Sequence, residues 1–592
     1  MDTNCVQGVD GVECHPLTSN AELFSFRRNP IKWNELVEPL APRSRPRKLG
    51  DAFGMMSFMD PPQQEYMMED KRPEVLVCHD LAGNYRADRF VDGAEKWDDY
   101  RFYHWAGIDY FCYFSHNYIT IPPLQWINAA HRHGVKVLGT FITESGAGEK
   151  IMAEVLQSED NMIRVVDELV FITNHCQFDG WLINIECQVI PEKIPLLKQF
   201  VSYLTGEIRR TVGGLVVWYD SVIENGTVLW QNEINFKNSS FFEVCDAILL
   251  NYNWNEKNLD DTEGFLSLKY PGRKKNVFVG IDVFGRGQVA QFKTHETLEK
   301  IAKRGLSIGL FAIGWTFEAM QNDSVDIFSE RGNTECNEAF FRRNNRFYAS
   351  FWNYLYTSGP CELPFYTSFC VGSGLVRREL GVIVSSSPWF NLRLQQPQMS
   401  TPIDHTYIEH HFEDSFDGGS CLRITSVSPR VYRLFCVDFN CTNDILFSFA
   451  LKRSNKDIDL DIILFIVDAT TEKRCRVVLA EDFLYTERVT WPGNCSMKPL
   501  IEDNLLHVQH FLNRSNEKHI PVRSDINGWE TRFYYLSFDS TVVPHIIDIG
   551  VRIRGQPFGG HWINLGAIGI HAGVINNLEY EKVSDEFSSQ NQ

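Results

Sequence analysis

Eight short apolar runs constrain the fold of this chain more than any other feature of its sequence. They lie at 74–78, 108–114, 135–142, 180–186, 215–219, 246–252, 276–283 and 307–315. Helix-like patterns occupy gaps between them, at 122–133, 161–176, 193–211 and 292–303. Nearly continuous apolar strands that alternate with amphipathic helices are typical of a parallel sheet that is buried on both faces. Eight such units in about 250 residues predict an α/β fold of the (β/α)8 barrel type.

The alternative architecture is an open, doubly wound sheet with helices on both of its faces. Such a sheet binds nucleotides through a glycine-rich phosphate loop after its first strand. No G-x-G-x-x-G sequence opens a helix after the run at 74–78. We therefore expect the closed barrel.

The character of the sequence changes after about residue 355. Pro360 and Pro364 punctuate a linker-like stretch, and short alternating segments without a long helical pattern follow at 420–426, 431–437, 444–450, 459–467 and 547–554. Regular short strands separated by turn signals are typical of a β-sandwich or a jelly roll. The expected division is a partly irregular lead-in over 1–70, a barrel over 71–355, an accessory β-sandwich over 356–580 and a frayed tail over 581–592.

Charge and cysteine usage argue against several classes of function. The chain has 592 residues and a formal net charge of −19, which argues against nucleic acid and anionic membrane surfaces as partners. The first 20 residues lack an apolar signal segment, and no apolar run is long enough to span a bilayer. The 15 cysteines occur singly, without a C-x-x-C pair. We expect a cytosolic protein with free thiols.

Polar and aromatic residues cluster at the end of every apolar run. In a barrel, the carboxyl ends of the strands carry the active site. The residues at these ends are His79-Asp80, Ser115-His116-Asn117, Thr143-Glu144, Asn184, Glu186, Tyr219-Asp220, Asn251-Tyr252-Asn253-Trp254, Asp282 and Trp315. We expect them to converge on one site. The candidates for substrate binding among them are His79, Glu144, Asn251, Trp254, Asp282 and Trp315.

The run from Phe178 to Glu186 carries the most specific pattern. It reads F-D-G-W-L-I-N-I-E, and because alternate side chains of a strand share a face, Asn184 and Glu186 point the same way. The spacing D-G-x-x-x-N-x-E is close to the D-G-x-D-x-D-x-E strand of family 18 chitinases, in which the last Glu is the general acid. The plain alternative is that both residues are strand-end polar groups paired with neighbours.

An Asn-x-Glu pair suits hydrolysis at an N-acetylated amino sugar. There the 2-acetamido oxygen of the sugar attacks the anomeric carbon, an exception to the scheme that needs two carboxylates. Glu186 would protonate the leaving oxygen and later activate water. The amide of Asn184 would hold the acetamido group through its donor and its acceptor. Tyr219 ends the next strand and could help, or it could be a strand-end tyrosine with a wet tip.

Aromatic residues follow several of the strands. Trp230 and Trp254 lie after the fifth and sixth strands, where they could stack on a sugar or hold a loop in place. Trp315 ends the eighth run and could floor a sugar subsite or pack in the core. Metal binding is not expected, because His131 and His133 lie two apart on a helical stretch and do not share a face. No cofactor is expected either.

Longer stretches of the barrel region carry a family resemblance, with their order and spacing kept. They include I-D-Y-F-C-Y-F-S-H from Ile108, G-T-F-I-T-E from Gly139, F-D-G-W-L-I-N-I-E from Phe178, W-Y-D-S-V from Trp218, N-Y-N-W from Asn251, G-I-D-V-F-G-R-G from Gly280 and L-P-F-Y-T-S-F-C from Leu363. These stretches resemble the endo-β-N-acetylglucosaminidases of glycoside hydrolase family 85, cytosolic enzymes that cut between the two core GlcNAc residues of N-glycans.

The resemblance implies roles for five residues. Glu186 would be the acid/base, Asn184 would orient the acetamido group and Tyr219 would assist it. Trp230 and Trp254 look like site aromatics of the family. The implied partner is an N-glycan, free or attached to protein, and the intermediate could also meet an acceptor sugar instead of water.

Two positions depart from the family pattern, which often has Asn after the catalytic Glu and Trp after the T-E of the third strand. This chain has Cys187 and Ser145 there. Strand alternation turns Cys187 away from Glu186, so we expect activity to be kept, whereas Ser145 bears on a substrate subsite. Two other functions stay open: a chitinase, which would prefer Asp at position 184, and a non-catalytic glycan-binding barrel, which would usually lack Glu186.

Overall fold

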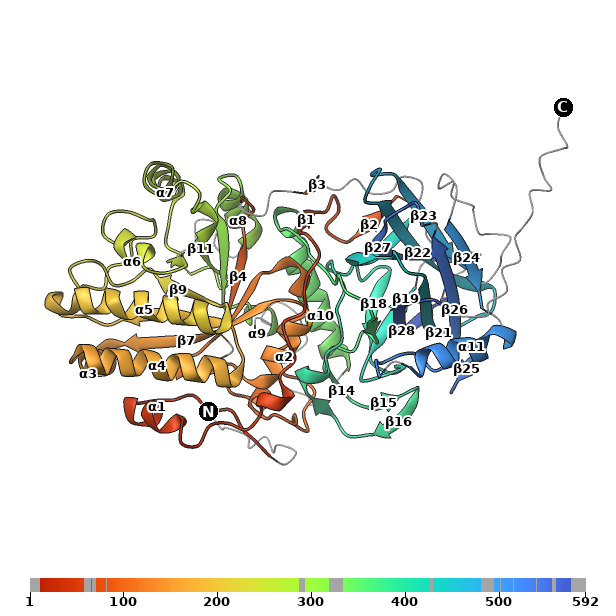
Figure 1. The fold of residues 1–592 in the computed structure, drawn as a ribbon, viewed down its shortest axis with the longest axis horizontal. Helices are drawn as coiled ribbons and strands as arrows, with labels where there is room; N and C mark the ends of the chain where they lie inside the picture. Colours follow the sequence, from red (N-terminus) through yellow and green to blue (C-terminus); the bar gives the residue numbers. More distant parts are fainter. Residues whose placement is uncertain are drawn as a thin grey trace.

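Eight parallel strands close into a barrel in the computed structural model (Figure 1). They are β4 (Val75–Asp80), β5 (Tyr110–Phe114), β7 (Lys136–Glu144), β8 (Gly180–Glu186), β9 (Leu215–Tyr219), β10 (Ala247–Leu250), β11 (Val277–Asp282) and β12 (Ser307–Phe311). The pairings of β12 with β4 and of β5 with β7 complete the ring. The short strand β6 (Ile119–Thr120) runs antiparallel along β7. The barrel and its eight predicted strands are confirmed.

The structure describes most of the chain. The described residues are 11–57, 65–66, 71–80, 82–286, 293–318, 334–425, 430–480, 495–500, 502–514, 516–538, 540–555 and 560–575. No helix among them is both long and apolar enough to cross a bilayer.

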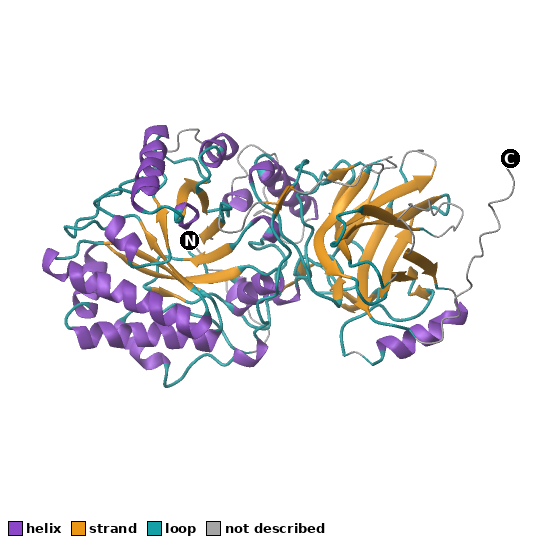
Figure 2. Cartoon of the chain, turned by 45° about the horizontal axis from the view of Figure 1, so that its top comes forward, coloured by secondary structure: helices purple, strands orange, loops and turns teal. Residues whose placement is uncertain are grey.

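Helices surround the barrel (Figure 2). They are α2 (Leu124–Arg132), α3 (Ser145–Val155), α4 (Glu159–Cys176), α5 (Ile194–Val212), α6 (Ser239–Glu243), α7 (Glu256–Lys269), α8 (Thr294–Ala302), α9 (Trp315–Glu318) and α10 (Thr334–Ala349). In α5, Leu197, Val201, Leu204 and Ile208 recur every three or four residues and are fully buried. Such a stripe makes one face of a helix apolar and directs it to the core.

The barrel strands are buried on both faces, which explains why they read as continuous apolar runs. One set of side chains, among them Leu76, Cys78 and Leu182, fills the barrel interior. The alternate set, which includes Val77 and Ile183, packs outward against the helices. This alternation decides which strand-end residue faces the mouth of the barrel.

The C-terminal part consists of two antiparallel sheets packed face to face. One has the order β18-β19-β28-β21-β26-β24 and the other β2-β20-β27-β22-β23. Their main strands are β18 (Ile408–His411), β19 (Cys421–Ile424), β20 (Val431–Asn440), β21 (Ile445–Arg453), β22 (Ile458–Asp468), β23 (Arg474–Leu479), β24 (Cys495–Pro499), β26 (Trp529–Phe538), β27 (Pro544–Gly555) and β28 (Ile563–Ala572). Leu434, Phe447, Leu464 and Ile568 belong to the core between the sheets. The predicted β-sandwich is confirmed.

Shorter elements join the two parts and complete the sheets. They are α1 (Asn20–Phe26), β1 (Arg47–Lys48), β2 (Met55–Met56), β3 (Glu65–Tyr66), β13 (Phe365–Thr367), β14 (Ser373–Gly374), β15 (Arg377–Glu379), β16 (Val382–Ser385), β17 (Trp389–Phe390) and β25 (Asp525–Ile526). The lead-in crosses from barrel to sandwich, because β2 pairs with β20. In the same region Arg47 forms a buried ion pair with Asp548.

One helix in the sandwich region does not appear in the sequence pattern. The helix α11 (Glu502–Leu512) lies where only short alternating segments are expected. Its residues Val508 and Leu512 pack with Leu446 and Phe533 of the sheet. Two buried residues give too weak a periodic signal to mark a helix from sequence.

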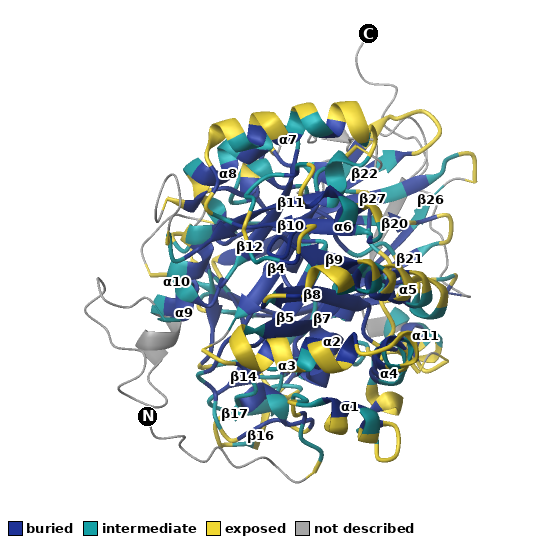
Figure 3. Ribbon diagram, turned by 90° about the vertical axis from the view of Figure 1, so that its left-hand side faces the viewer, coloured by how far each residue is buried: buried dark blue, intermediate teal, exposed yellow. Residues whose placement is uncertain are grey.

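The sandwich lies beside the amino-terminal ends of the barrel strands, and the carboxyl ends open on the far side (Figures 1 and 3). One contact shows this placement directly: His133, just before β7, accepts a hydrogen bond from the backbone N–H of Gln398 at 2.9 Å. A site at the carboxyl ends is therefore remote from the sandwich.

Candidate active site

A pocket of about 170 Å³ opens at the carboxyl ends of the barrel strands. Its polar and aromatic lining comes from all eight barrel strands or the loops directly after them: Asp80, Phe114, His116, Glu144, Asn184, Glu186, Tyr219, Tyr252, Arg286 and Phe311. Leu76, Cys78 and Leu182 of the barrel interior form its apolar floor. This is the end of a barrel at which active sites lie.

Asn184 and Glu186 both line this pocket, as the alternation of a strand requires. Ile183 and Ile185 point the other way and are fully buried. The side-chain oxygen of Asn184 is buried and has no hydrogen-bond partner among the described residues. An unsatisfied buried acceptor costs about 1–3 kcal/mol. A molecule that brings an N–H group into the pocket would remove that cost.

Two charged residues, the acidic Glu144 and the basic His116, act on the carboxyl group of Glu186. Burial raises the pKa of its carboxyl group, and the negative charge of Glu144 raises this pKa further. The charge of His116 and hydrogen bonds from the side chains of Trp230 and Asn184 oppose the rise. A carboxyl group that keeps its proton to higher pH is suited to general acid catalysis.

Glu144 sits directly beside Glu186 because the two residues are partners in the register of β7 and β8. The ring nitrogen Nδ1 of His116 lies 3.2 and 3.1 Å from the two carboxylate oxygens of Glu144. This hydrogen bond raises the pKa of His116 above its ordinary value. The pocket thus holds the carboxyl group of Glu186 next to the pair formed by His116 and Glu144.

Tyr219 ends β9 and lines the pocket beside Glu186. Its hydroxyl donates to Oδ1 of Asn251 at 2.8 Å. Burial, followed by the charge of Glu186, raises the pKa of Tyr219 well above its ordinary value, so the hydroxyl remains protonated. Asn251 itself does not line the pocket and reaches it through Tyr219.

Trp230 lies in the loop after β9 and is 44% exposed. Its side chain hydrogen-bonds the Glu186 carboxyl group, for which the indole N–H is the donor. The N–H edge of the indole therefore lies beside the candidate acid, while much of the ring remains open to solvent. This is a suitable position for contact with a sugar ring.

Two sequence-predicted residues are buried away from the pocket. His79 lies on the outward face of β4, with ring centroids 5.0 Å from Phe111 and 4.8 Å from Trp126. Trp254 is 2% exposed, and its indole donates to the backbone oxygen of Gly280 at 2.8 Å. Their burial favours packing roles and corrects the expectation that these side chains face the substrate.

Two further candidates stand behind the pocket wall. Asp282 is fully buried and forms an ion pair with Arg286 at 2.6 Å, and it is Arg286 that lines the pocket. Trp315 begins α9, and its ring centroid lies 5.9 Å from that of Phe347. Asp282 is thus linked to the pocket through Arg286, whereas Trp315 does not line the pocket.

Some pocket residues are adjacent to the candidates chosen from sequence. The structure places Asp80 and Tyr252 in the pocket, next in sequence to His79 and Asn251, together with His116. The strand-end clusters contain all three, so the signal is present in the sequence. The sequence does not show which of two adjacent residues points into the barrel.

The two departures from the family pattern have different surroundings. Cys187 is buried outside the pocket, and its thiol donates to the hydroxyl of Thr143 at 3.4 Å. Ser145 is exposed at the start of α3, next to Glu144, with φ at +52°. Only Ser145 is close to the mouth of the barrel.

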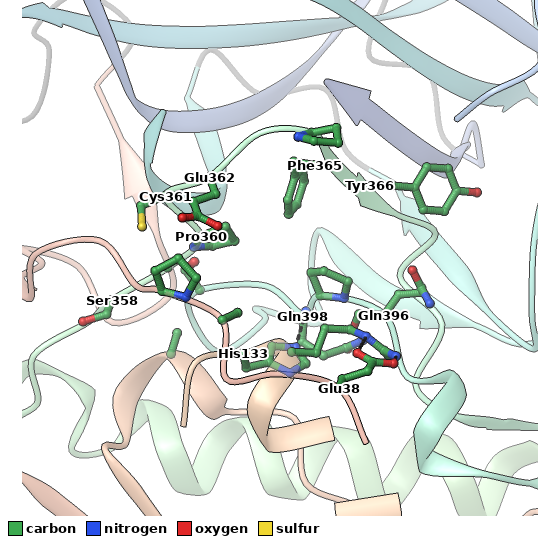
Figure 4. Close-up of a pocket in the computed structure, with 18 of the residues that line it drawn as sticks. Glu38, His133, Ser358, Pro360, Cys361, Glu362, Phe365, Tyr366, Gln396 and Gln398 are labelled. Atoms are coloured by element: carbon green, nitrogen blue, oxygen red, sulfur yellow. Dashed lines mark hydrogen bonds and ion pairs between the residues drawn. The ribbon is translucent and has the colours of Figure 1, made fainter. Parts of the chain in front are cut away.

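A larger cavity lies elsewhere. It has a volume of about 460 Å³ and lies between the barrel and the sandwich (Figure 4). None of the candidate residues lines it. Both ring nitrogens of His133 in its wall are occupied, by Ala129 O at 2.6 Å and Gln398 N at 2.9 Å. Within the described residues, no cluster of His, Cys, Asp and Glu could hold a metal ion.

Comparison with known proteins adds to this geometry. The sequence model of glycosyl hydrolase family 85 matches residues 83–376. The chain is 38% identical over 429 residues to the cytosolic endo-beta-N-acetylglucosaminidase of Homo sapiens, covering 70% of this chain and 52% of that protein. It is 39% identical over 373 residues to the protein of the same name from Gallus gallus, covering 62% and 49%. The chain spans about half the length of these curated relatives.

A solved structure shares the fold. The glycoside hydrolase domain of Endo-D from Streptococcus pneumoniae superposes with a TM-score of 0.66 at 17% identity, covering 95% of this chain and 83% of that chain. The region matched by the family model includes the strands that carry Asn184, Glu186 and Tyr219. This chain therefore belongs to glycosyl hydrolase family 85.

Proposed function

We propose that this protein is an endo-β-N-acetylglucosaminidase that hydrolyses the β1,4 bond between the two core GlcNAc residues of N-glycans. The observation that carries the proposal is the pairing of Glu186, whose pKa is raised by burial, with the unpartnered amide oxygen of Asn184 in one pocket. The family match and the names of the curated relatives support the same activity and a cytosolic location.

The reaction begins with the substrate as its own nucleophile. The carbonyl oxygen of the 2-acetamido group attacks the anomeric carbon, the glycosidic C–O bond breaks, and Glu186 gives its proton to the leaving oxygen. Oδ1 of Asn184 accepts the acetamido N–H, which turns the carbonyl oxygen towards the anomeric carbon. The positive charge that develops on the acetamido group then lies close to the Asn184 oxygen, whose dipole stabilises it.

The second step reverses the proton transfer. Glu186, now a carboxylate, removes a proton from water as the water attacks the anomeric carbon and opens the oxazolinium ring. The two displacements give net retention of configuration. A sugar hydroxyl in place of water would give transglycosylation.

The adjacent carboxylate of Glu144 raises a second mechanism, in which Glu144 is the nucleophile and the acetamido group a spectator. Its ion pair with His116 argues against this role, because both carboxylate oxygens lie against the ring nitrogen. Glu144 in our proposal pairs with His116 and raises the pKa of the acid beside it.

Mass spectrometry of the products from a high-mannose glycopeptide tests the function. The expected product is the peptide with a single GlcNAc, together with a glycan that ends in the other GlcNAc. Glu186→Gln should abolish turnover while glycan binding persists. Efficient cleavage of chitotetraose with an intact glycopeptide would instead indicate a chitinase, and binding without turnover by the unaltered protein would indicate a lectin.

A further inference from the structure

Asp220 is a buried carboxylate that the proposed reaction does not use. It follows Tyr219 at the end of β9 and has no exposed surface. Burial raises the pKa of its carboxyl group to about 6, and the main influences that oppose this rise are hydrogen bonds rather than a lysine or an arginine. Burying a carboxylate without a cation is costly unless hydrogen bonds compensate it. The groups that donate these hydrogen bonds therefore indicate the structural role of Asp220.

Three hydrogen bonds to the Asp220 carboxylate come from one loop, and the backbone of Asn251, just after the neighbouring strand β10, supplies another. Its Oδ2 accepts the backbone N–H groups of Gln231 at 3.0 Å and of Asn232 at 2.8 Å. Its Oδ1 accepts from the side-chain amide of Asn238 at 3.1 Å. The same amide of Asn238 donates to the backbone oxygen of Glu233 at 2.8 Å. Asp220 therefore fastens the loop at both ends of the segment 231–238.

The loop is also fastened to the neighbouring strand. Oδ1 of Asn232 accepts from the side chain of Asn251 at 2.8 Å and from the backbone N–H of Asn253 at 3.0 Å. Asn251 in turn accepts from the hydroxyl of Tyr219 at 2.8 Å. Asn232 adopts φ of +58°, a conformation that asparagine tolerates better than most residues. The anchored conformation thus ends at a residue of the candidate active site.

The residue that this anchoring serves is Trp230. It directly precedes the two backbone groups held by Asp220, and its side chain hydrogen-bonds Glu186. Since Trp230 is 44% exposed and the preceding Leu229 is 48% exposed, packing alone does not fix this turn. An exposed loop without buried contacts samples many conformations.

We propose that Asp220 is a positioning residue, which fixes the loop 229–232 so that the Trp230 ring is held against Glu186 at the glycan-binding mouth of the barrel. The proposal rests on the function proposed above for the contact of Trp230 with a sugar. It assigns no chemistry to Asp220 itself. Its effect on turnover must therefore pass through Trp230, and this dependence can be measured.

The first measurement needs no substrate. Asp220→Asn replaces one acceptor oxygen with an amide that cannot accept from the loop. Hydrogen exchange of the intact protein should become at least about tenfold faster in a peptide that spans 228–234. The matched control is Asp179→Asn, since Asp179 also accepts a backbone N–H, that of Val137 at 2.7 Å, but at the amino end of the barrel. It should speed exchange around Val137 and leave 228–234 unchanged.

The second measurement is a double-mutant cycle on glycopeptide turnover. Asp220→Asn should lower kcat/KM about tenfold in the natural background and less than about twofold in the background of Trp230→Ala. Equal losses in the two backgrounds, or no loss in either, would overturn the assignment. If the unaltered protein does not turn over the glycopeptide, the proposed function fails, whereas the exchange result still decides whether Asp220 holds the loop.

A second variant covers the case in which Asp220→Asn does not fold. Asn238→Ala removes one donor from the Asp220 carboxylate and keeps the two backbone donors. The same comparison in the two backgrounds then applies, with a smaller loss of about threefold expected in the natural background. A loss that is the same without Trp230 would contradict the proposal.

Discussion

Glu144 and Glu186 end neighbouring parallel strands in register, so that two carboxyl groups lie side by side in one pocket. Like charges at such a position cannot both ionise freely, and the pKa of one of them rises. Here the pKa of Glu186 is raised, mainly by its burial and further by the charge of Glu144. The ring nitrogen of His116 lies against both oxygens of the other carboxyl group. The arrangement places a carboxyl group of raised pKa beside a second carboxyl group that pairs with a histidine.

The pH profile of turnover tests this arrangement through Glu144→Gln. The protonated form of Glu186 is the active acid, so its raised pKa extends activity to higher pH. Removing the negative charge of Glu144 removes one cause of the rise. The alkaline limb of the kcat/KM profile should therefore move to lower pH, with turnover retained. Loss of all turnover would show instead that Glu144 is the nucleophile.

His116→Asn should move the alkaline limb of the kcat/KM profile to higher pH, opposite to the shift expected for Glu144→Gln. The positive charge of His116 lowers the pKa of Glu186, so its removal leaves the Glu144 charge uncompensated and raises that pKa. The alkaline limb of kcat/KM is expected at higher pH than in the natural protein. Shifts of the same sign in His116→Asn and Glu144→Gln would contradict an electrostatic origin.

Asn184→Ala should slow hydrolysis of the intact glycan about 10²–10³-fold, because one preorganised group at the developing charge is lost. KM should change less, since the glycan contacts other parts of the pocket. A preformed sugar oxazoline no longer needs its acetamido group oriented for attack. Its hydrolysis by Asn184→Ala should therefore be much closer to the natural rate, and an equal loss on both substrates would refute the role of Asn184.

The sequence predicts the barrel better than it predicts the membership of its pocket, and the reason is physical. Strand positions follow from apolar runs, and these runs are continuous because both faces of each strand are covered. The same continuity hides which alternate residues turn inward. In β8 the two polar residues at 184 and 186 show which alternate side chains point into the barrel. In β4 the sequence does not show whether His79 or Asp80 points inward, and only Asp80 lines the pocket.

Loops after the strands are less predictable still. The indole of Trp230 reaches Glu186 because Asp220 and Asn251 hold its loop, and these contacts join residues that lie up to 21 apart. Hydrogen bonds between residues so far apart leave no local pattern in the amino-acid sequence. Trp254 follows the end of its strand by only four residues, against 11 for Trp230, yet its ring turns into the core.

At the junction of the lead-in and the sandwich, we expect a substitution to lower the free energy of unfolding without changing turnover. Arg47 and Arg433 share the fully buried carboxylate of Asp548. Arg47→Ala leaves part of that charge unpaired and should cost about 3 kcal/mol in urea unfolding of the sandwich. The kcat of the folded enzyme should not change, because the pocket lies at the other end of the barrel. As a control, Lys257→Ala breaks the exposed pair with Asp261 and should leave the urea midpoint of unfolding nearly unchanged.

Trp230 and Trp254 provide the sharpest contrast, because the sequence marks both as candidate sugar-binding residues and only Trp230 is exposed in the structure. Trp254→Ala should remove a buried ring and cost about 3–5 kcal/mol of unfolding free energy. Trp230→Ala should change that free energy by about 0.5 kcal/mol or less, as expected of an exposed side chain. Its kcat/KM should fall about tenfold, the equivalent of one lost aromatic contact with the sugar. Urea unfolding and steady-state kinetics of the two variants check both values. If Trp254→Ala were stable and inactive while Trp230→Ala were fully active, Trp254 would be the sugar-binding aromatic and the anchored loop would have another purpose.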